Sequence, residues 1–153
     1  MDTIQKMLLS HPISGGFTVE QVDQIAKFTT YLEFHRDEYV FRQGERAEHF
    51  FLILNGSVQV ELFSGPSGPV SLQKVGEGDV LGWSWLVPPY RWRFDARVLT
   101  PLKTLKVDAK NLKILMEQNP QVGYAVLKRF IQLIGDRLES ERFKLIELYA
   151  SHS

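Results

Sequence analysis

The stretch VFRQGERAEHFFLILNGSVQVEL, residues 40–62, decides the fold of this chain. Its apolar run FFLIL is followed by Asn55-Gly56 and then by SVQVELF, in which apolar and polar residues alternate. Asn-Gly favours a type I′ turn, because both central residues of that turn need positive φ angles. The stretch therefore predicts two antiparallel strands joined by a tight hairpin.

Short β-rich segments continue on both sides of this stretch. The segments are YLEF (31–34), EYVFRQG (38–44), FFLIL (50–54), SVQVELF (57–63), VSLQKV (70–75), DVLGWSW (79–85), RWRFDARVL (91–99) and LKTLKV (102–107). Turn-forming sequences such as SGPSGP (64–69) and GEGD (76–79) separate them. About eight short strands with glycine-rich turns predict an antiparallel β-roll, that is, a jelly-roll barrel.

Helical patterns flank the strands. Thr18 stands three residues before Gln21, as in a capping box, so we expect a helix that ends near Thr30. After residue 108 the segment DAKNLKILMEQ predicts a short helix, and Pro120 opens a helix of about 30 residues, roughly 45 Å long. We therefore expect one α+β domain over 1–153, with an N-terminal helical segment (1–30), a β-roll (31–107) and C-terminal helices (108–153).

The last helix carries a stripe at alternating steps of four and three residues. Its members are Leu127, Ile131, Ile134, Leu138, Glu141, Leu145 and Leu148. A heptad stripe of this length is typical of a coiled-coil seam. We expect a homodimer through this helix; the alternative is that the stripe packs on the chain's own roll.

Composition narrows the class of protein. The 153 residues are 44% hydrophobic and 24% charged, with a formal net charge of zero, as in an ordinary soluble domain. There is no cysteine, so disulfides, iron–sulfur clusters and cysteine nucleophiles are excluded. The N-terminal sequence predicts neither a signal peptide nor a membrane span, and we expect a cytoplasmic protein.

Two motifs resemble the cyclic-nucleotide-binding domain of the catabolite activator protein superfamily. The stretch 40–62 is similar to the opening half of that fold, and VGEGDVLGW (75–83) is similar to the approach to its phosphate-binding cassette. In the family that cassette resembles F-G-E-x-A-L, followed by P-R-x-A-x-V. The resemblance implies that its Glu accepts a bond from the ribose 2′-hydroxyl and that its Arg pairs with the cyclic phosphate.

The chain departs from the cassette at both of these positions. Gly82 matches the family glycine, but Trp83 stands at the position of the Glu, and Phe94 falls at that of the Arg. Losing a charged hydrogen-bonding partner commonly costs about 2 to 5 kcal/mol. We therefore expect weak binding of cAMP and cGMP, unless Arg93, one place away, substitutes.

The surrounding stretch GWSWLVPPYRWRFDAR (82–97) predicts the ligand contacts. The candidate residues are Gly82, Trp83, Trp85, Arg91, Trp92, Arg93, Asp95 and Arg97. Arginine forks bind phosphate and the edge of guanine, and indole rings stack on bases, which favours a cyclic dinucleotide such as cyclic di-GMP. Strand alternation would turn the arginines and Asp95 away from the family pocket, to an external or shared site. The alternative is a ligand-free scaffold whose pocket is filled by Trp83 and Phe94.

No enzyme motif or metal site is evident. His11, His35, His49 and His152 are scattered, without the spacing of a metal site, and we expect no cofactor. We expect no catalysis and, without a recognition helix after the long helix, no direct DNA binding. A sensor of this kind needs a protein partner, for which a transcription factor of the same superfamily is our expectation.

Overall fold

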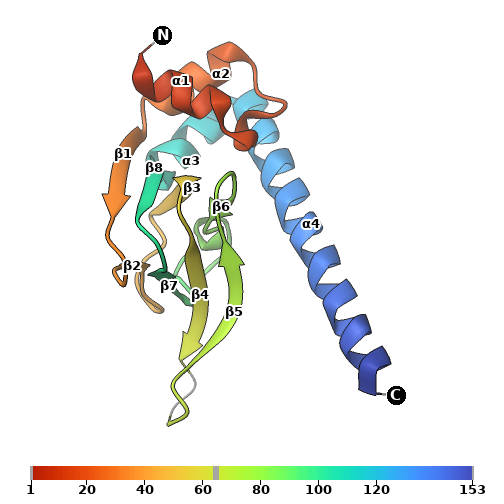
Figure 1. Ribbon diagram of the computed structural model, residues 1–153. Helices are drawn as coiled ribbons and strands as arrows, with labels where there is room; N and C mark the ends of the chain where they lie inside the picture. The colour runs from red at the N-terminus through yellow and green to blue at the C-terminus, as the bar shows by residue number, and fades with distance from the viewer. Residues whose placement is uncertain (1, 64–65, 153) are drawn as a thin grey trace.

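The computed structural model describes residues 2–63 and 66–152, with the backbone alone at 151 and 152, and forms an antiparallel β-roll flanked by helices (Figure 1). The elements are α1 (Thr3–Ser10), η1 (Pro12–Ser14), α2 (Val19–Ala26), β1 (Thr29–Phe34), β2 (Tyr39–Phe41), β3 (His49–Asn55), β4 (Val58–Phe63), β5 (Pro69–Val75), β6 (Val80–Leu81), η2 (Ser84–Leu86), β7 (Asp95–Val98), β8 (Leu102–Asp108), α3 (Ala109–Gln118) and α4 (Pro120–His152). The predicted α+β class is confirmed. Ser64 and Gly65, which begin the predicted SGPSGP turn, lie outside the described residues.

The strands form two four-stranded sheets, ordered β1-β8-β3-β6 and β2-β7-β4-β5. All their pairings are antiparallel. Apolar side chains from both sheets, such as Leu52, Ile53, Val98 and Leu105, are almost completely buried between them. The predicted strands thus close a common core, as a roll requires.

The Asn55-Gly56 step is not the predicted hairpin. β3 pairs with β8 and β6, whereas β4 pairs with β5 and β7, so this turn carries the chain from one sheet to the other. Gly56 has a φ of 102°, while Asn55 is not among the described residues with positive φ. A Cβ on Gly56 would clash with the Pro101 carbonyl oxygen. The sequence signal was correct for a tight turn but wrong about the pairing partner.

The N-terminal segment holds two α-helices rather than one. The predicted capping box is confirmed, since Gln21 N donates to Thr18 Oγ1 and Thr18 N donates to Gln21 Oε1. The helix nevertheless ends at Ala26 rather than near Thr30, because Thr29 already pairs with Val107 as β1 joins β8. Tertiary pairing with β8 outweighs the local helical period here.

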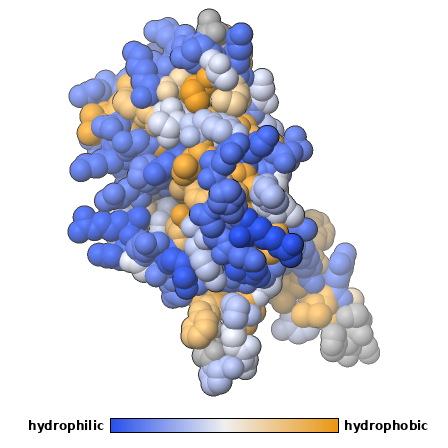
Figure 2. Space-filling model, turned by 60° about the vertical axis from the view of Figure 1, so that its left-hand side comes forward, coloured by the Kyte–Doolittle hydropathy of each residue, from blue (hydrophilic) through white to orange (hydrophobic). Residues whose placement is uncertain are grey.

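The helix α4 contributes buried core residues through its first half only. Val122, Val126 and Phe130 are buried in the core, and toward the C-terminus the helix leaves the roll (Figure 1). Figure 2 shows apolar side chains on both projections at the lower end of the molecule, the β4–β5 hairpin and the end of α4. Within the described residues, no helix combines the length and hydropathy needed to cross a membrane.

Candidate functional site

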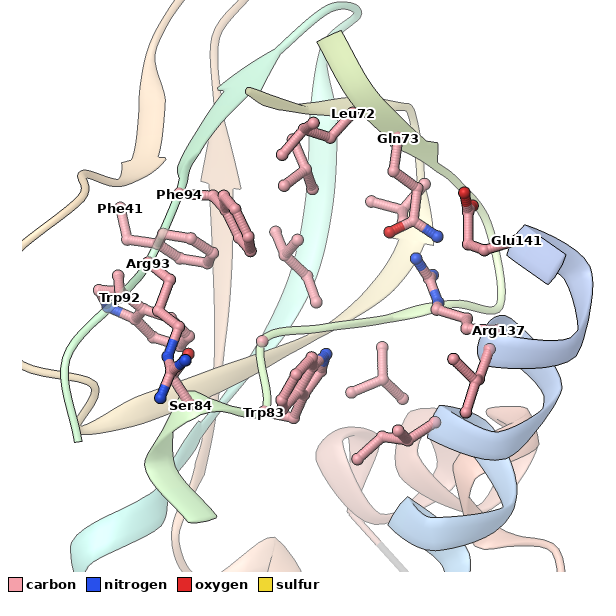
Figure 3. A pocket seen from close by; sticks show the side chains of 17 residues that line it. Phe41, Leu72, Gln73, Trp83, Ser84, Trp92, Arg93, Phe94, Arg137 and Glu141 are labelled. Carbon is pink, nitrogen blue, oxygen red and sulfur yellow. The ribbon is translucent and has the colours of Figure 1, made fainter. Parts of the chain in front are cut away.

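A pocket of about 420 Å³ lies between the β-roll and α4 (Figure 3). Its floor is largely apolar and consists of residues from β4, β5 and β6. Two other walls carry the aromatic and charged side chains. One wall is aromatic and contains Phe41, Trp83, Trp92 and Phe94. The other is the face of α4 with Ile134, Arg137, Leu138 and Glu141. A volume of this size is within the range of small-molecule sites, roughly 300 to 1,000 Å³.

The aromatic wall depends on Gly82. The ring of Trp92 stacks on Phe41, with centroids 3.8 Å apart and planes at 8°. A Cβ on Gly82 would lie 2.6 Å from Cη2 of Trp92, and Gly82 also has a φ of 99°. Only glycine fits this close approach and this backbone conformation without strain. Gly82 therefore acts through the backbone, by letting Trp92 pack against it.

Trp83 and Phe94 line the pocket without filling it. Trp83 precedes η2 and remains 42% exposed, and Phe94 is half-buried on the neighbouring wall. The cavity between them is open (Figure 3). The structure therefore does not support the scaffold hypothesis in which these two rings close the pocket.

Arg93 lies on the pocket wall, contrary to the predicted alternation. Arg93 and Phe94 form a bend, and β7 begins only at Asp95, so Trp92, Arg93 and Phe94 all contact the pocket. The period of two holds only in extended strands, so the expectation that Arg93 points away from the pocket is wrong. Among the described residues, Arg93 has no hydrogen-bonding or ion-pair partner, and its guanidinium is free to meet an anion.

Trp85 belongs to the core. It is fully buried, stacks on Phe50 at 5.1 Å and meets Phe130 edge-on at 5.2 Å. The 3-10 turn of η2 rotates this ring away from Trp83 and into the space beneath α4. The structure does not bring Trp85 to the pocket.

Arg91 and Asp95 are also placed away from the pocket. Arg91 Nη1 donates to the Gly44 carbonyl at 2.8 Å. The Asp95 carboxylate is buried rather than on the predicted arginine face, where it accepts from Gln43 N at 2.7 Å and pairs with Arg42 Nε at 3.4 Å. Arg91, before β7, and Asp95, the first residue of β7, both connect this part of the chain to the 42–46 loop.

Arg97 is engaged in an ion-pair network inside the second sheet. Its guanidinium meets both carboxylate oxygens of Glu61, at 3.1 and 3.2 Å, and reaches Asp37 at 3.3 Å. The hydrogen bond to Glu61 raises the pKa of Arg97 above its ordinary value. Because Glu61 is almost completely buried on β4, Arg97 serves to neutralise it.

The wall from α4 supplies polar residues that the sequence analysis missed. Arg137 is half-buried, and its guanidinium lies near Gln73 and Glu141 on the side of the pocket opposite Arg93 (Figure 3). Burial lowers the pKa of Arg137, whereas the charges of Asp79 and Glu141 act in the opposite direction. The sequence did contain a signal that Arg137 faces the pocket. Arg137 lies between Ile134 and Leu138, on the same face of the predicted helix.

The site can therefore hold a flat, anionic molecule. It offers aromatic faces, an apolar floor and guanidinium groups on two opposite sides. Among the described residues, no three His, Asp or Glu side chains converge to form a metal site. The side chain of His152 lies outside the described residues.

The fold and the pocket can be compared with known proteins. Residues 31–119 match the cyclic nucleotide-binding domain family. Among solved structures, the chain is similar to a cyclic nucleotide-binding domain from Methylobacillus flagellatus KT, with a TM-score of 0.79, 22% identity and coverage of 94% of this chain and 81% of that one. It is also similar to the regulatory subunit of a cAMP-independent protein kinase A from Trypanosoma brucei, with a TM-score of 0.70, 23% identity and coverage of 92% and 50%.

A curated relative is a candidate potassium channel protein from Rhodopseudomonas palustris, 23% identical over 117 residues. The match covers 76% of this chain but only 28% of the length of that relative. At such low identity the solved structures show a shared fold, whereas the family match spans more than half of the chain. The resemblance found in the cassette motifs is confirmed, and the chain belongs to the cyclic nucleotide-binding domain family of the catabolite activator protein superfamily.

Proposed function

We propose that this chain is a regulatory domain that senses a nucleotide second messenger, and that its ligand is a cyclic mononucleotide bound in the pocket between the roll and α4. The observation that carries the proposal is the unpaired guanidinium of Arg93 on the aromatic wall. Arg93 stands one residue before Phe94. Phe94 occupies the position at which the family has its phosphate-binding arginine. A guanidinium fork matches the oxygens of a phosphate in charge and geometry.

The remaining contacts follow from the positions of the walls. Trp83 and Phe94 offer ring faces to the sugar and base, in place of the family's carboxylate at residue 83. Arg137 and Glu141 stand on the far side, one a donor fork and the other an acceptor. Guanine presents two acceptors to an arginine and N–H donors to a carboxylate, so we expect cGMP to bind more tightly than cAMP.

The hypothesis that the ligand is a cyclic dinucleotide has less support than the sequence suggested. It relied on three arginines, and two of them, Arg91 and Arg97, are bonded to Gly44 and Glu61. Of these three, Arg93 alone lines the pocket. Cyclic di-GMP is therefore the second ligand in the test below, favoured by the surviving combination of Arg93 and Trp83.

The test is calorimetric titration of the purified chain with cGMP, cAMP and cyclic di-GMP at physiological salt. We expect saturable binding of a mononucleotide, accompanied by a change in the fluorescence of the exposed Trp83. The Arg93→Ala variant should bind about 10- to 100-fold more weakly, because hydrogen bonds to charged groups contribute about 1.5 to 3 kcal/mol.

Arg91→Ala is the matched control, since it removes the same charge two residues away but off the pocket. It should bind with the affinity of the wild type. Absence of binding by all three nucleotides would refute the sensor function. Equal affinities of the wild type and Arg93→Ala would remove Arg93 from the site, and selective binding of cyclic di-GMP would restore the dinucleotide hypothesis.

The same proposal includes a homodimer through α4. Most of the predicted stripe is exposed rather than packed on the chain's own roll, with Ile131 at 68% and Leu145 at 55% exposure, whereas Ile134 is half-buried at the pocket. A second copy of the same helix supplies the complementary heptad stripe that would cover these residues. We retain a cytoplasmic location and a signalling partner, for which a transcription factor of the same superfamily is our choice.

A further inference from the structure

A second cleft lies where the N-terminal segment meets the start of α4. Its volume is about 520 Å³. One wall consists of Gly15, Gly16 and Thr18, which lie between η1 and α2, together with Gln21 of α2. The other wall consists of residues from the 121–132 part of α4. Figure 1 shows the N-terminal helices beside the first turns of α4. This cleft shares no lining residue with the pocket that we assign to the cyclic nucleotide.

The lining of this cleft is polar and positively charged. It contains Lys128 and Arg129, and none of the described residues that line it is acidic. Lys128 is exposed, with its Nζ atom 5.7 Å from the centre of the Tyr124 ring, and it has no ion-pair partner among the described residues. Two cations without a nearby carboxylate attract an anion.

Arg129 brings an unused donor to this position. Its Nη2 atom donates to the Pro12 carbonyl at 2.7 Å, and Nη1 donates to Gln132 Oε1 at 3.3 Å. Its Nε atom is buried and has no hydrogen-bond partner among the described residues. Each Nη group carries two N–H bonds and donates only one of them in these two contacts, so the guanidinium that lines the cleft keeps unused donors for an oxyanion.

The glycines leave the cleft open beside this guanidinium. A Cβ on Gly15 would lie 3.7 Å from Cζ of Arg129, and a Cβ on Gly16 would meet nothing within 4 Å. Gly16 has a φ of 92°, so the chain turns away there without placing a side chain in the cleft. The backbone at Gly15 and Gly16 therefore adds no side chain to this edge of the cleft.

We propose that this cleft is a second binding site, specific for a small molecule that carries a phosphate monoester. The phosphate contacts Lys128 Nζ and the unused Nη donors of Arg129, the two cationic groups that line the cleft. The cleft is larger than one phosphate, and Gln21, Gln121 and Tyr124 line the rest of it with amide and hydroxyl groups. Such groups suit the hydroxyls of a sugar, so the ligand class is a phosphorylated sugar.

The site is tested by NMR titration of the isotopically labelled chain with ribose 5-phosphate and with inorganic phosphate, at constant ionic strength. We expect saturable shifts of the backbone amides of Gly15, Gly16 and Thr18. The Lys128→Ala variant should weaken binding about tenfold, as loss of one charged hydrogen bond predicts. The control is Lys110→Ala, which removes an exposed lysine on α3 away from the cleft.

The two probes separate two sources of the same chemistry. Tighter binding of ribose 5-phosphate than of phosphate supports a sugar phosphate ligand, and equal binding supports recognition of the phosphate group alone. The proposal is overturned if neither probe shifts these amides more than sodium chloride does. It is also overturned if Lys128→Ala binds as tightly as Lys110→Ala. Because the readout is the amides of residues 15–18, the result is independent of nucleotide binding beside Trp83.

Discussion

His11 is a titratable side chain held without charge at the junction of the N-terminal segment and the roll. It is 5% exposed, and its Nδ1 atom accepts from Ile13 N at 3.0 Å. Burial lowers the pKa of His11 below its ordinary value, and the nearby Arg129 acts in the same direction. Backbone groups of Asp79 and Ile53 and the charge of Asp79 oppose this shift without cancelling it.

The direction of this shift predicts a loss of stability in acid. The unfolded chain takes up the proton at the ordinary His pKa of 6.5, before the folded chain does, so unfolding binds a proton and becomes easier as the pH falls. We expect the free energy of unfolding to be constant for this group above neutral pH and to fall from about pH 6.5 downward. The slope is at most about 1.4 kcal/mol per pH unit.

The variant His11→Asn isolates this contribution. Asparagine keeps an acceptor for the Ile13 amide but does not titrate. Urea unfolding at pH 7 and pH 5 should show a smaller acid loss for the variant than for the wild type. Some loss remains, because burial and Lys106 lower the pKa of His49 too. Identical pH dependence in the two proteins would show that His11 is not the group responsible.

At the scale of the element, the two halves of α4 have different roles. Its first half is a core helix, with Phe130 packed against Phe50 and Trp85. Its second half carries Arg137 and Glu141 to the pocket and leaves Phe143 exposed. Helical period places these residues on different faces, so one element connects the core with the ligand site.

This division predicts unequal effects of the same substitution on the two halves. Phe130→Ala should lower the free energy of unfolding by about 3 to 5 kcal/mol, because it leaves a cavity in the core. Phe143→Ala should change it by less than about 0.5 kcal/mol, as at an ordinary surface position. Chemical denaturation measures both. Similar losses from the two variants would mean that the second half of α4 packs as tightly as the first.

At the scale of the whole molecule, the stripe on α4 exposes apolar side chains such as Ile131, Leu138 and Leu145 on the single chain. We expect light scattering coupled to gel filtration to give the mass of a dimer at micromolar concentration. Leu145→Asp places a charge on the stripe and should give a monomer, because a charge at a buried seam is strongly unfavourable. A wild-type monomer at every concentration would exclude this interface.

Phe143→Asp provides the comparison for this experiment. It makes the same kind of change on an exposed residue of the same helix, two residues from Leu145 but off the stripe. This variant should remain a dimer. If both variants dissociate, the interface extends around the helix rather than following the heptad stripe.

The sequence by itself determined the elements whose signals are local. The Thr18–Gln21 cap, the approximate positions of the strands and the start of the long helix at Pro120 were predictable. Each rests on residues within a few positions of one another, which is the range over which backbone hydrogen bonds and helical period act. The cassette motifs identified the family for the same reason, because they are contiguous.

Only the tertiary structure decided which strands pair and which arginine is free. Asn55-Gly56 forms a turn, but the strands on its two sides do not pair with each other: β3 pairs with β8, and β4 pairs with β5. Arg93 and Arg97 are four residues apart and chemically identical, yet Arg97 is neutralised by Glu61, 36 residues earlier in the chain, and Arg93 is not. Sheet pairing and charge neutralisation depend on distant residues that folding brings together, so no local pattern encodes them.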